Sequence, residues 1–254
     1  MWVSRMRTTI ARVGLERVAL VLLAISAMGM LSPSFGVQAA EPGTAHSAGG
    51  VAPIPSAETW RTAVLTFAKA HERNPAWGFS HSERDYELGR SLAAADHVKL
   101  DDDVMFAAAY LHDIGAFQPY ARRGVDHSDI GADIVGQLLS NTGFPTAKIP
   151  AVAAAIRTHM YYRSAVGAEA IYLHDADALD WLGAIGAARI FGLEDPQGGQ
   201  PDGPAAVKRL QNLLMQVPPG LESKAGKAML APRVRELRRI LAELSAETDA
   251  YRIL

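Results

Sequence analysis

The chain has 254 residues, of which 49% are hydrophobic and 20% are charged, a balance typical of a globular protein with a sizeable core. Its formal net charge of −2 offers no basic footprint for a nucleic-acid polymer. Because there is no cysteine, disulfides, thiolate metal sites and cysteine nucleophiles are excluded, and the eight histidines must carry any soft-ligand chemistry.

Residues 1–39 have the order of a secretory signal peptide. Four arginines and one acid occupy residues 1–17, fourteen residues without a charge follow, and small residues lead to a cleavage site after Ala39. A transmembrane helix needs about 20 apolar residues, so this run is short for a membrane span. The sequence predicts export to a periplasm-like compartment, with an uncleaved N-terminal anchor as the alternative. Residues 40–56, rich in glycine, proline, alanine and serine, predict a flexible linker.

From residue 57 the apolar side chains recur at three- and four-residue steps, the period of amphipathic helices. The first predicted helix is broken at 74–79, where an Asn-Pro pair and a glycine occur. Ser82 is followed by an acid three residues later, which predicts the N-cap of the next helix. His81 is therefore expected just ahead of a helix N-terminus.

Three consecutive aspartates at 101–103 predict the start of the following helix, where negative charge suits the helix dipole. The apolar face of that helix places His112 and Asp113 near its end. A loop at 115–126 then leads to another amphipathic helix, and His127 stands at its start.

Four further segments carry apolar residues at helical spacing: 149–156, 169–192, 207–214 and 234–244. The first ends near His159, and the second is one long helix or two helices that meet near Gly183. The sequence shows no convincing strand alternation and no internal repeat of 20–50 residues. It therefore predicts an all-α protein with a single compact helical domain over residues 57–254.

Asp175, Asp177 and Asp180 crowd a stretch that otherwise reads as buried. Buried carboxylates are costly unless they are paired or bound to a cation, so these three favour a nearby positive centre. A divalent metal needs several nitrogen and oxygen ligands on rigid elements, and helix ends and faces supply that rigidity.

The pattern of His81, the adjacent pair His112 and Asp113, and Asp177 resembles the HD-domain metal-dependent phosphohydrolase superfamily. Residues 111–114 are similar to its defining doublet, and residues 175–189 resemble the last motif of its small stand-alone bacterial members. The resemblance covers roughly residues 60–192. It implies an HD-type helical domain with these metal ligands: His81, His112, Asp113 and Asp177.

The resemblance implies catalytic roles around the metal for Asp113, His127 and His159. The two histidines match positions that ligate a second metal in dinuclear branches and that contact substrate phosphate in mononuclear ones. The resemblance places the last ligand at Asp177, because the family's final aspartate ligand is followed three residues later by a polar helix neighbour, here Asp180. Asp175 is the second choice, and it points away from the helix face that residues 177 and 180 share.

Substrate contacts are expected from residues that can bind phosphate oxygens or lie beside the metal: Arg84, Arg123, Asp180 and Arg189. An ordinary ion pair is the alternative role for each arginine. The remaining histidines of the helical domain, His71, His97 and His174, are expected to be surface or packing residues.

The resemblance implies metal-assisted hydrolysis of a phosphoester or phosphoanhydride in a small phosphorylated substrate, with nucleotides as one class. Mixed histidine and aspartate ligation favours Mn²⁺ or Fe²⁺, with Mg²⁺, Co²⁺, Ni²⁺ and Zn²⁺ as alternatives. Two other functions fit the same residues: a dinuclear iron oxygenase, and a non-catalytic metal or nucleotide sensor. Because nucleoside triphosphates are chiefly cytoplasmic, export favours another phosphoester as the substrate.

Overall fold

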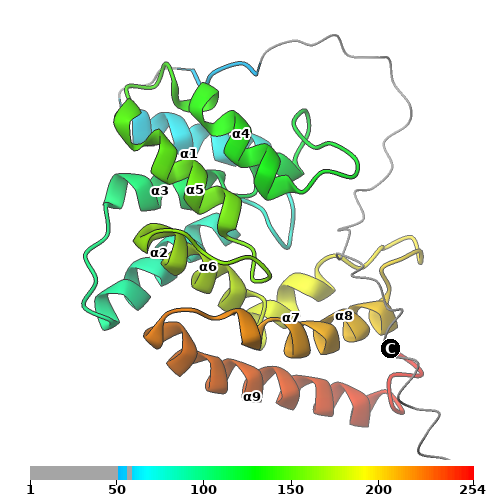
Figure 1. The fold of residues 1–254 in the computed structure, drawn as a ribbon. Coiled ribbons are helices and arrows are strands. Elements are labelled where there is room, and N and C mark those ends of the chain that lie inside the picture. The colour runs from blue at the N-terminus through cyan, green and yellow to red at the C-terminus, as the bar shows by residue number, and fades with distance from the viewer. Residues whose placement is uncertain (1–50, 56–58) are drawn as a thin grey trace, which may run out of the picture. The chain divides into compact units, whose positions relative to one another are not determined.

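Residues 51–55 and 59–254 are described by the structure, a computed structural model (Figure 1). The predicted signal peptide and most of the predicted linker lie outside these described residues. At the end of the linker, Ile54 is buried, and its amide donates a 2.9 Å hydrogen bond to the carbonyl of Leu138. No helix in the described part of the chain is long and apolar enough to cross a membrane.

The described residues form nine α-helices, three short 3-10 helices and no strand, which confirms the all-α class. The α-helices are α1 (Trp60–His71), α2 (Phe79–Ala95), α3 (Asp102–Leu111), α4 (His127–Leu139), α5 (Ile149–Thr158), α6 (Ala168–Asp180), α7 (Gly183–Phe191), α8 (Gly203–Gln216) and α9 (Lys224–Glu247).

Helix α3 is surrounded by other helices in the hydrophobic core. Its residues from Val104 to Leu111 are all buried, and they contact α1, α2, α5 and α6, which lie around α3 in Figure 1. A helix that is apolar on every side can be stable only in such a position. The end of α3 therefore delivers the next two residues, His112 and Asp113, into the protein interior.

The three aspartates at the start of α3 have a structural role. The carboxylate of Asp101 caps the helix by accepting from the backbone amides of Asp103 and Val104. The ammonium group of Lys148 lies 2.8 Å from the carboxylates of both Asp101 and Asp103. This arrangement satisfies the first amides of the helix and complements its dipole.

The predicted start of α2 was wrong by one helical turn. The helix begins at Phe79 with Gly78 as its N-cap, so His81 lies inside the first turn and not ahead of it. The chain turns tightly there, and a Cβ on Gly78 would come within 2.7 Å of the carbonyl oxygen of Glu72. Ser82 does not cap the helix; its hydroxyl donates a 3.0 Å hydrogen bond to the buried carboxylate of Glu72.

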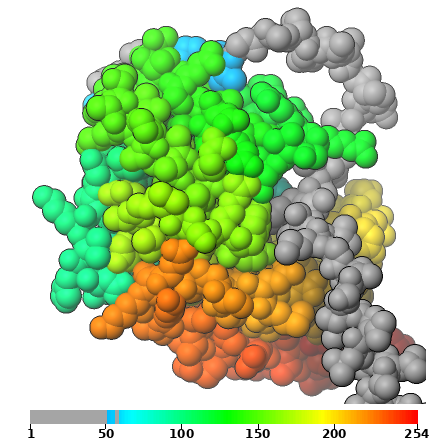
Figure 2. All heavy atoms as spheres, in the orientation of Figure 1, coloured from blue at the N-terminus to red at the C-terminus, as the bar shows by residue number. Residues whose placement is uncertain are grey.

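The long apolar stretch at 169–192 forms two helices, α6 and α7. Gly183, the first residue of α7, has a φ of +70°, a conformation that side-chain-bearing residues rarely adopt. Helix α9 contacts α6, α7 and α8, and the orange atoms at its start lie beside the yellow-green atoms of α6 in Figure 2. Asp175 links α6 to α9, because its carboxylate accepts hydrogen bonds from Ser223, the N-cap of α9.

Candidate metal centre

Five helices converge on a cluster of histidines and aspartates in the interior. The positions are the first turn of α2, the C-cap of α3 and the residue after it, the first residue of α4, the C-cap of α5, and the buried face of α6. The side chains that they provide are, in that order, His81, His112, Asp113, His127, His159 and Asp177. All are buried except His127, which is partly exposed.

One group of these side chains surrounds Nε2 of His81. This atom lies 3.3 Å from Nε2 of His112, 3.3 Å from Oδ1 of Asp177 and 3.6 Å from Oδ2 of Asp113. Ligand atoms at about 2.1 Å from one tetrahedral or octahedral ion are roughly 3.0–3.4 Å apart. The spacing of the group therefore fits the ligands of a single divalent metal ion.

The orientation of the histidine rings also fits metal binding. Nδ1 of His112 lies 2.8 Å from the carbonyl oxygen of Ala109, and Nδ1 of His159 lies 2.6 Å from that of Ile156. A carbonyl oxygen only accepts, so Nδ1 is the donor in both rings. In the neutral imidazole, Nε2 then carries a lone pair that faces the cluster, which is the tautomer that a metal requires.

His81 is oriented in the same way by a carboxylate. Its Nδ1 lies 2.9 Å from Oδ2 of Asp180, which also accepts from Arg84 at 2.8 Å and from Arg189 at 3.0 Å. Arg189 is buried, with its guanidinium 3.6 Å from the ring centre of Trp181. The three residues predicted to contact substrate therefore lie behind His81: Asp180 holds the imidazole ring, and Arg84 and Arg189 compensate the charge of Asp180.

A second group adjoins the first one through Asp113. Oδ1 of this residue lies 3.1 Å from Nε2 of His127 and 3.7 Å from Nε2 of His159, and the two nitrogens are 3.3 Å apart. Oδ2 of Asp113 lies 3.3 Å from Nε2 of His112 in the first group. Asp113 therefore turns one carboxylate oxygen toward each group.

The cluster attracts positive charge. Although burial opposes a charged ring, the carboxylate of Asp113 raises the pKa of His112 to about 10. Burial and the neighbouring imidazoles of His112 and His127 lower the pKa of His159 to about 3. His112 is thus the place where a proton and a divalent cation would compete, while His159 stays neutral at physiological pH.

Asp85 is a member of the cluster that was not predicted from the sequence. It is fully buried on α2, and its Oδ2 lies 3.2 Å from Nε2 of His81, yet neither carboxylate oxygen has a hydrogen-bond partner. Oδ2 of Asp177 is likewise buried without a hydrogen bond. Such carboxylate oxygens are costly in the interior unless a cation satisfies them, so the donor set fits a metal. The available signal was the spacing from residue 81, which puts residue 85 on the same helix face.

The other candidate residues lie apart from the cluster. Arg123 is exposed in the loop before α4 and forms no hydrogen bond or ion pair with the cluster within the described residues. His71 bonds to its own helix through the carbonyl of Phe67, and His97 is exposed just after α2. His174 is fully buried, with Nδ1 3.0 Å from a carboxylate oxygen of Asp175.

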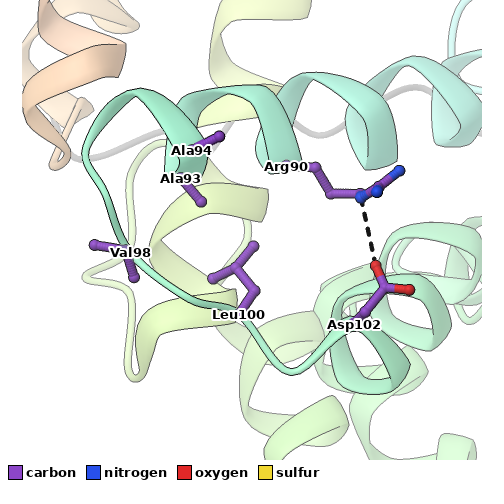
Figure 3. A pocket seen from close by; sticks show the side chains of 6 residues that line it. All are labelled: Arg90, Ala93, Ala94, Val98, Leu100 and Asp102. Atoms are coloured by element: carbon purple, nitrogen blue, oxygen red, sulfur yellow. Dashed lines mark ion pairs between the residues drawn. The ribbon is translucent and has the colours of Figure 1, made fainter.

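A separate hollow of about 410 Å³ lies between the end of α2 and the start of α3 (Figure 3). Arg90 and Asp102 face each other across it, with Nε 3.4 Å from Oδ1. None of the histidines and aspartates of the cluster lines this hollow, so the hollow provides no access to the candidate site. Its lining residues are Arg90, Ala93, Ala94, Val98, Leu100 and Asp102.

A family model described as "HD domain" matches residues 78–182. The matched span runs from the N-cap of α2 to just beyond α6, so it contains every residue of the cluster. No curated protein matches the chain.

Solved structures resemble the chain over most of their length. A predicted HD superfamily hydrolase from an uncultured Thermotogales bacterium is 25% identical with a TM-score of 0.51, covering 74% of this chain and 90% of that chain. An HD-superfamily hydrolase from Bacillus thuringiensis is 22% identical with a TM-score of 0.52, covering 75% and 97%. Bacillus subtilis YpgQ in complex with ADP is 17% identical with a TM-score of 0.57, covering 74% and 97%. The last two show a shared fold.

Proposed function

We propose that this chain, which carries an HD domain at residues 78–182, is a metal-dependent phosphohydrolase. The observation that carries the proposal is the convergence of His81, His112 and Asp177. Nε2 of His81 lies 3.3 Å from both Nε2 of His112 and Oδ1 of Asp177, and the ring orientations leave Nε2 available. The similarity to the Thermotogales HD superfamily hydrolase supports a hydrolytic role.

The residues proposed to hold the metal are His81, His112, Asp113 and Asp177. When bound, a divalent ion would polarise a phosphoryl oxygen and lower the pKa of a water molecule. Asp180 keeps His81 in position through its hydrogen bond to Nδ1, and Arg84 and Arg189 hold Asp180 in turn. The ring of His112 is held by the carbonyl of Ala109.

Asp113 and His127 are the proposed acid–base residues. The carboxylate of Asp113 has its pKa held well below the usual range, because the imidazoles of His112 and His127 outweigh the effect of burial. Asp113 therefore stays ionised and can accept a hydrogen bond from the attacking water. Burial opposes charge on His127, but Asp113 raises the pKa of this ring, so it can carry a proton near the developing negative charge.

The proposed substrate is a small phosphorylated molecule that approaches from the side of His127. The side chain of His127 is 16% exposed, whereas those of His81, His112 and His159 are at most 1% exposed. The complex of YpgQ with ADP supports a phosphorylated ligand for this fold. Of the two arginines that hold Asp180, the proposed substrate contact is Arg84, whose side chain is 34% exposed, whereas Arg189 is buried.

A dinuclear iron oxygenase is the second candidate. It is favoured by the second group, in which Nε2 of His127 and Nε2 of His159 are 3.3 Å apart and lie 3.1 Å and 3.7 Å from Oδ1 of Asp113. Two metal ions per chain and oxygen consumption with an organic substrate would support it. One ion per chain together with phosphate release would support the phosphohydrolase.

We also propose that the protein is exported and cleaved after Ala39, on the composition of residues 1–39. Expression of the full chain followed by cell fractionation and intact-mass measurement tests this. A periplasmic product whose mass begins at Ala40 is expected. Retention of residues 1–39 in the membrane fraction would instead support an N-terminal anchor.

The function is tested by metal analysis of the purified chain and by a panel of nucleotides and simple phosphoesters supplied with Mn²⁺ or Fe²⁺. We expect bound metal and phosphate release in the wild type, and loss of both in His112→Ala. Hydrolysis at the wild-type rate in that variant would contradict the proposal. Tight nucleotide binding without turnover across the panel would favour a sensor.

A further inference from the structure

His81 and Asp85 lie one turn apart on α2 and face the same side of it. Both are buried, with exposed fractions of 1% and 0%. Oδ2 of Asp85 is 3.2 Å from Nε2 of His81 and 3.8 Å from Nε2 of His112. Asp85 therefore approaches the same point as the metal ligands proposed above.

The carboxylate of Asp85 lacks any hydrogen-bond donor. Both of its oxygens are buried without a hydrogen-bond partner. The nitrogens that it faces are the Nε2 atoms of His81 and His112, whose Nδ1 atoms are engaged by Asp180 and Ala109. In the neutral tautomers, lone pairs then face carboxylate oxygens. That arrangement is repulsive unless a positive charge lies between them.

The other buried acids of this region contrast with Asp85. Asp180 accepts hydrogen bonds from Arg84 and Arg189, and Asp175 accepts from the backbone and the hydroxyl of Ser223. Each therefore has protein groups that compensate its charge. Among the described residues, Asp85 faces only the imidazoles of His81 and His112 and has no arginine, amide or hydroxyl donor, although it is as deeply buried as they are. A general need for helix capping or ion pairing does not account for it.

We propose that Asp85 is a further ligand of the metal ion, beside His81, His112, Asp113 and Asp177. This inference rests on the metal site of the proposed function, but not on the reaction catalysed there. Three carboxylates with two imidazoles form an oxygen-rich set, which suits Mn²⁺ and related oxygen-preferring ions better than the same site with one carboxylate fewer. Asp85 thereby sets the metal preference of the site.

The variant Asp85→Asn tests the inference, because it removes the charge and keeps the shape. Full-length wild type and variant, stripped with a chelator, would be titrated with Mn²⁺ by calorimetry. We expect the affinity of the variant to fall by about tenfold or more. When Mn²⁺ and Zn²⁺ compete for the site, the variant should bind a larger share of Zn²⁺ than the wild type does. Glu87→Gln, on the exposed face of the same helix, makes the same charge change and should leave both quantities unaltered.

Two further measurements separate ligation from a structural role. Metal-free Asp85→Asn should unfold at the same temperature as the metal-free wild type or higher, because Asp85 has no hydrogen bond to lose. The Co²⁺-loaded variant should absorb visible light more strongly than the wild type, as expected when the coordination number falls. Asp85→Glu should restore part of the Mn²⁺ affinity.

Unchanged Mn²⁺ affinity in Asp85→Asn would overturn the inference. That result would mean that Asp85 is protonated and neutral and donates a hydrogen bond to His81, because asparagine can donate such a hydrogen bond as well. The proposed phosphohydrolase would survive it. Conversely, weakened Mn²⁺ binding in the variant, together with a wild type that cleaves no phosphoester, would support Asp85 as a ligand and contradict the proposed function.

Discussion

Asp180 accepts a 2.9 Å hydrogen bond from Nδ1 of His81, across 99 residues of sequence. This bond sets the ring orientation that turns Nε2 toward the cluster. Histidine ligands of metals depend on such partners, and losing the partner weakens metal binding. Asp180 at the end of α6 therefore acts on the metal through the Nδ1 side of His81 and is not itself one of the grouped metal-type ligands.

Replacing Asp180 with asparagine should weaken Mn²⁺ binding by about 10- to 100-fold, the usual effect of losing a partner of a metal ligand. The amide keeps the shape but leaves Arg84 and Arg189 without their shared counter-charge. Calorimetric titration of the metal-free protein measures the change. Asp133→Asn, an exposed acid that pairs with Arg157, is the control and should bind Mn²⁺ as the wild type does. Equal affinities for Asp180→Asn and the control would exclude the positioning role.

Metal binding should stabilise the fold, because the ligands come from separate helices. A ligand present at 100 times its dissociation constant adds about 2.7 kcal/mol to the free energy of unfolding. Adding Mn²⁺ to the chelator-treated protein should therefore raise its melting temperature in a thermal scan. His112→Ala should show no such rise. His97→Asn, which replaces an exposed histidine at φ +59° with a residue that tolerates this conformation, should respond like the wild type. A rise in His112→Ala equal to that of the wild type would show that the metal binds elsewhere.

Raising the pH should lower the stability of the metal-free protein and strengthen the binding of Mn²⁺. The pKa of His112 is raised to about 10 beside Asp113, and burial raises that of Asp85 to about 8. The folded metal-free protein then binds more protons than the unfolded chain, so its stability should fall as the pH rises from 6.5 toward 8. Mn²⁺ must displace these protons, so its affinity should rise over the same range. Melting temperatures with chelator and with Mn²⁺ measure both trends. Parallel trends would mean that no proton is exchanged for the metal.

The apolar pattern predicts that several residues of the cluster lie at helix ends, and the resemblance to the HD-domain superfamily predicts that they converge on one metal. The alanine-rich run before His112 predicts a buried helix, and a buried helix must end at an interior position. The role of Asp85 could not be predicted in the same way. Ser82 and the acid three residues later match a capping box, which makes Asp85 a capping residue. The capping interpretation fails because the tight turn at Gly78, which packs against the backbone of Glu72 and Asn74, starts the helix one turn earlier than the Ser82 pattern suggests.

The three aspartates of α6 illustrate the same limit. Helical spacing separates Asp175 from Asp177 and Asp180, but it does not say what Asp175 contacts. Its partner, Ser223, comes from the start of α9, 48 residues further along the chain. The crowding of three buried acids predicts a nearby cation for the whole segment. In the structure, Asp175 does not need one, because backbone amides and a hydroxyl group donate hydrogen bonds to it.

Asp175 and Asp177 should consequently differ in what their loss affects. Asp175→Ala removes a buried acceptor of hydrogen bonds from the amide of Glu222 and from the amide and hydroxyl of Ser223. Hydrogen bonds to charged groups contribute about 1.5–3 kcal/mol each, and because such bonds are not additive we expect a loss of roughly 2–4 kcal/mol in the free energy of unfolding. Urea unfolding in the presence of chelator measures this loss. Mn²⁺ affinity, measured under conditions where the variant is folded, should stay within about twofold of the wild type.

Asp177→Asn should give the reverse result, with Mn²⁺ binding lost and the metal-free stability nearly unchanged, because one oxygen of Asp177 has no protein hydrogen bond. Loss of Mn²⁺ binding in Asp175→Ala, with Asp177→Asn binding normally, would move the metal ligand from residue 177 to residue 175.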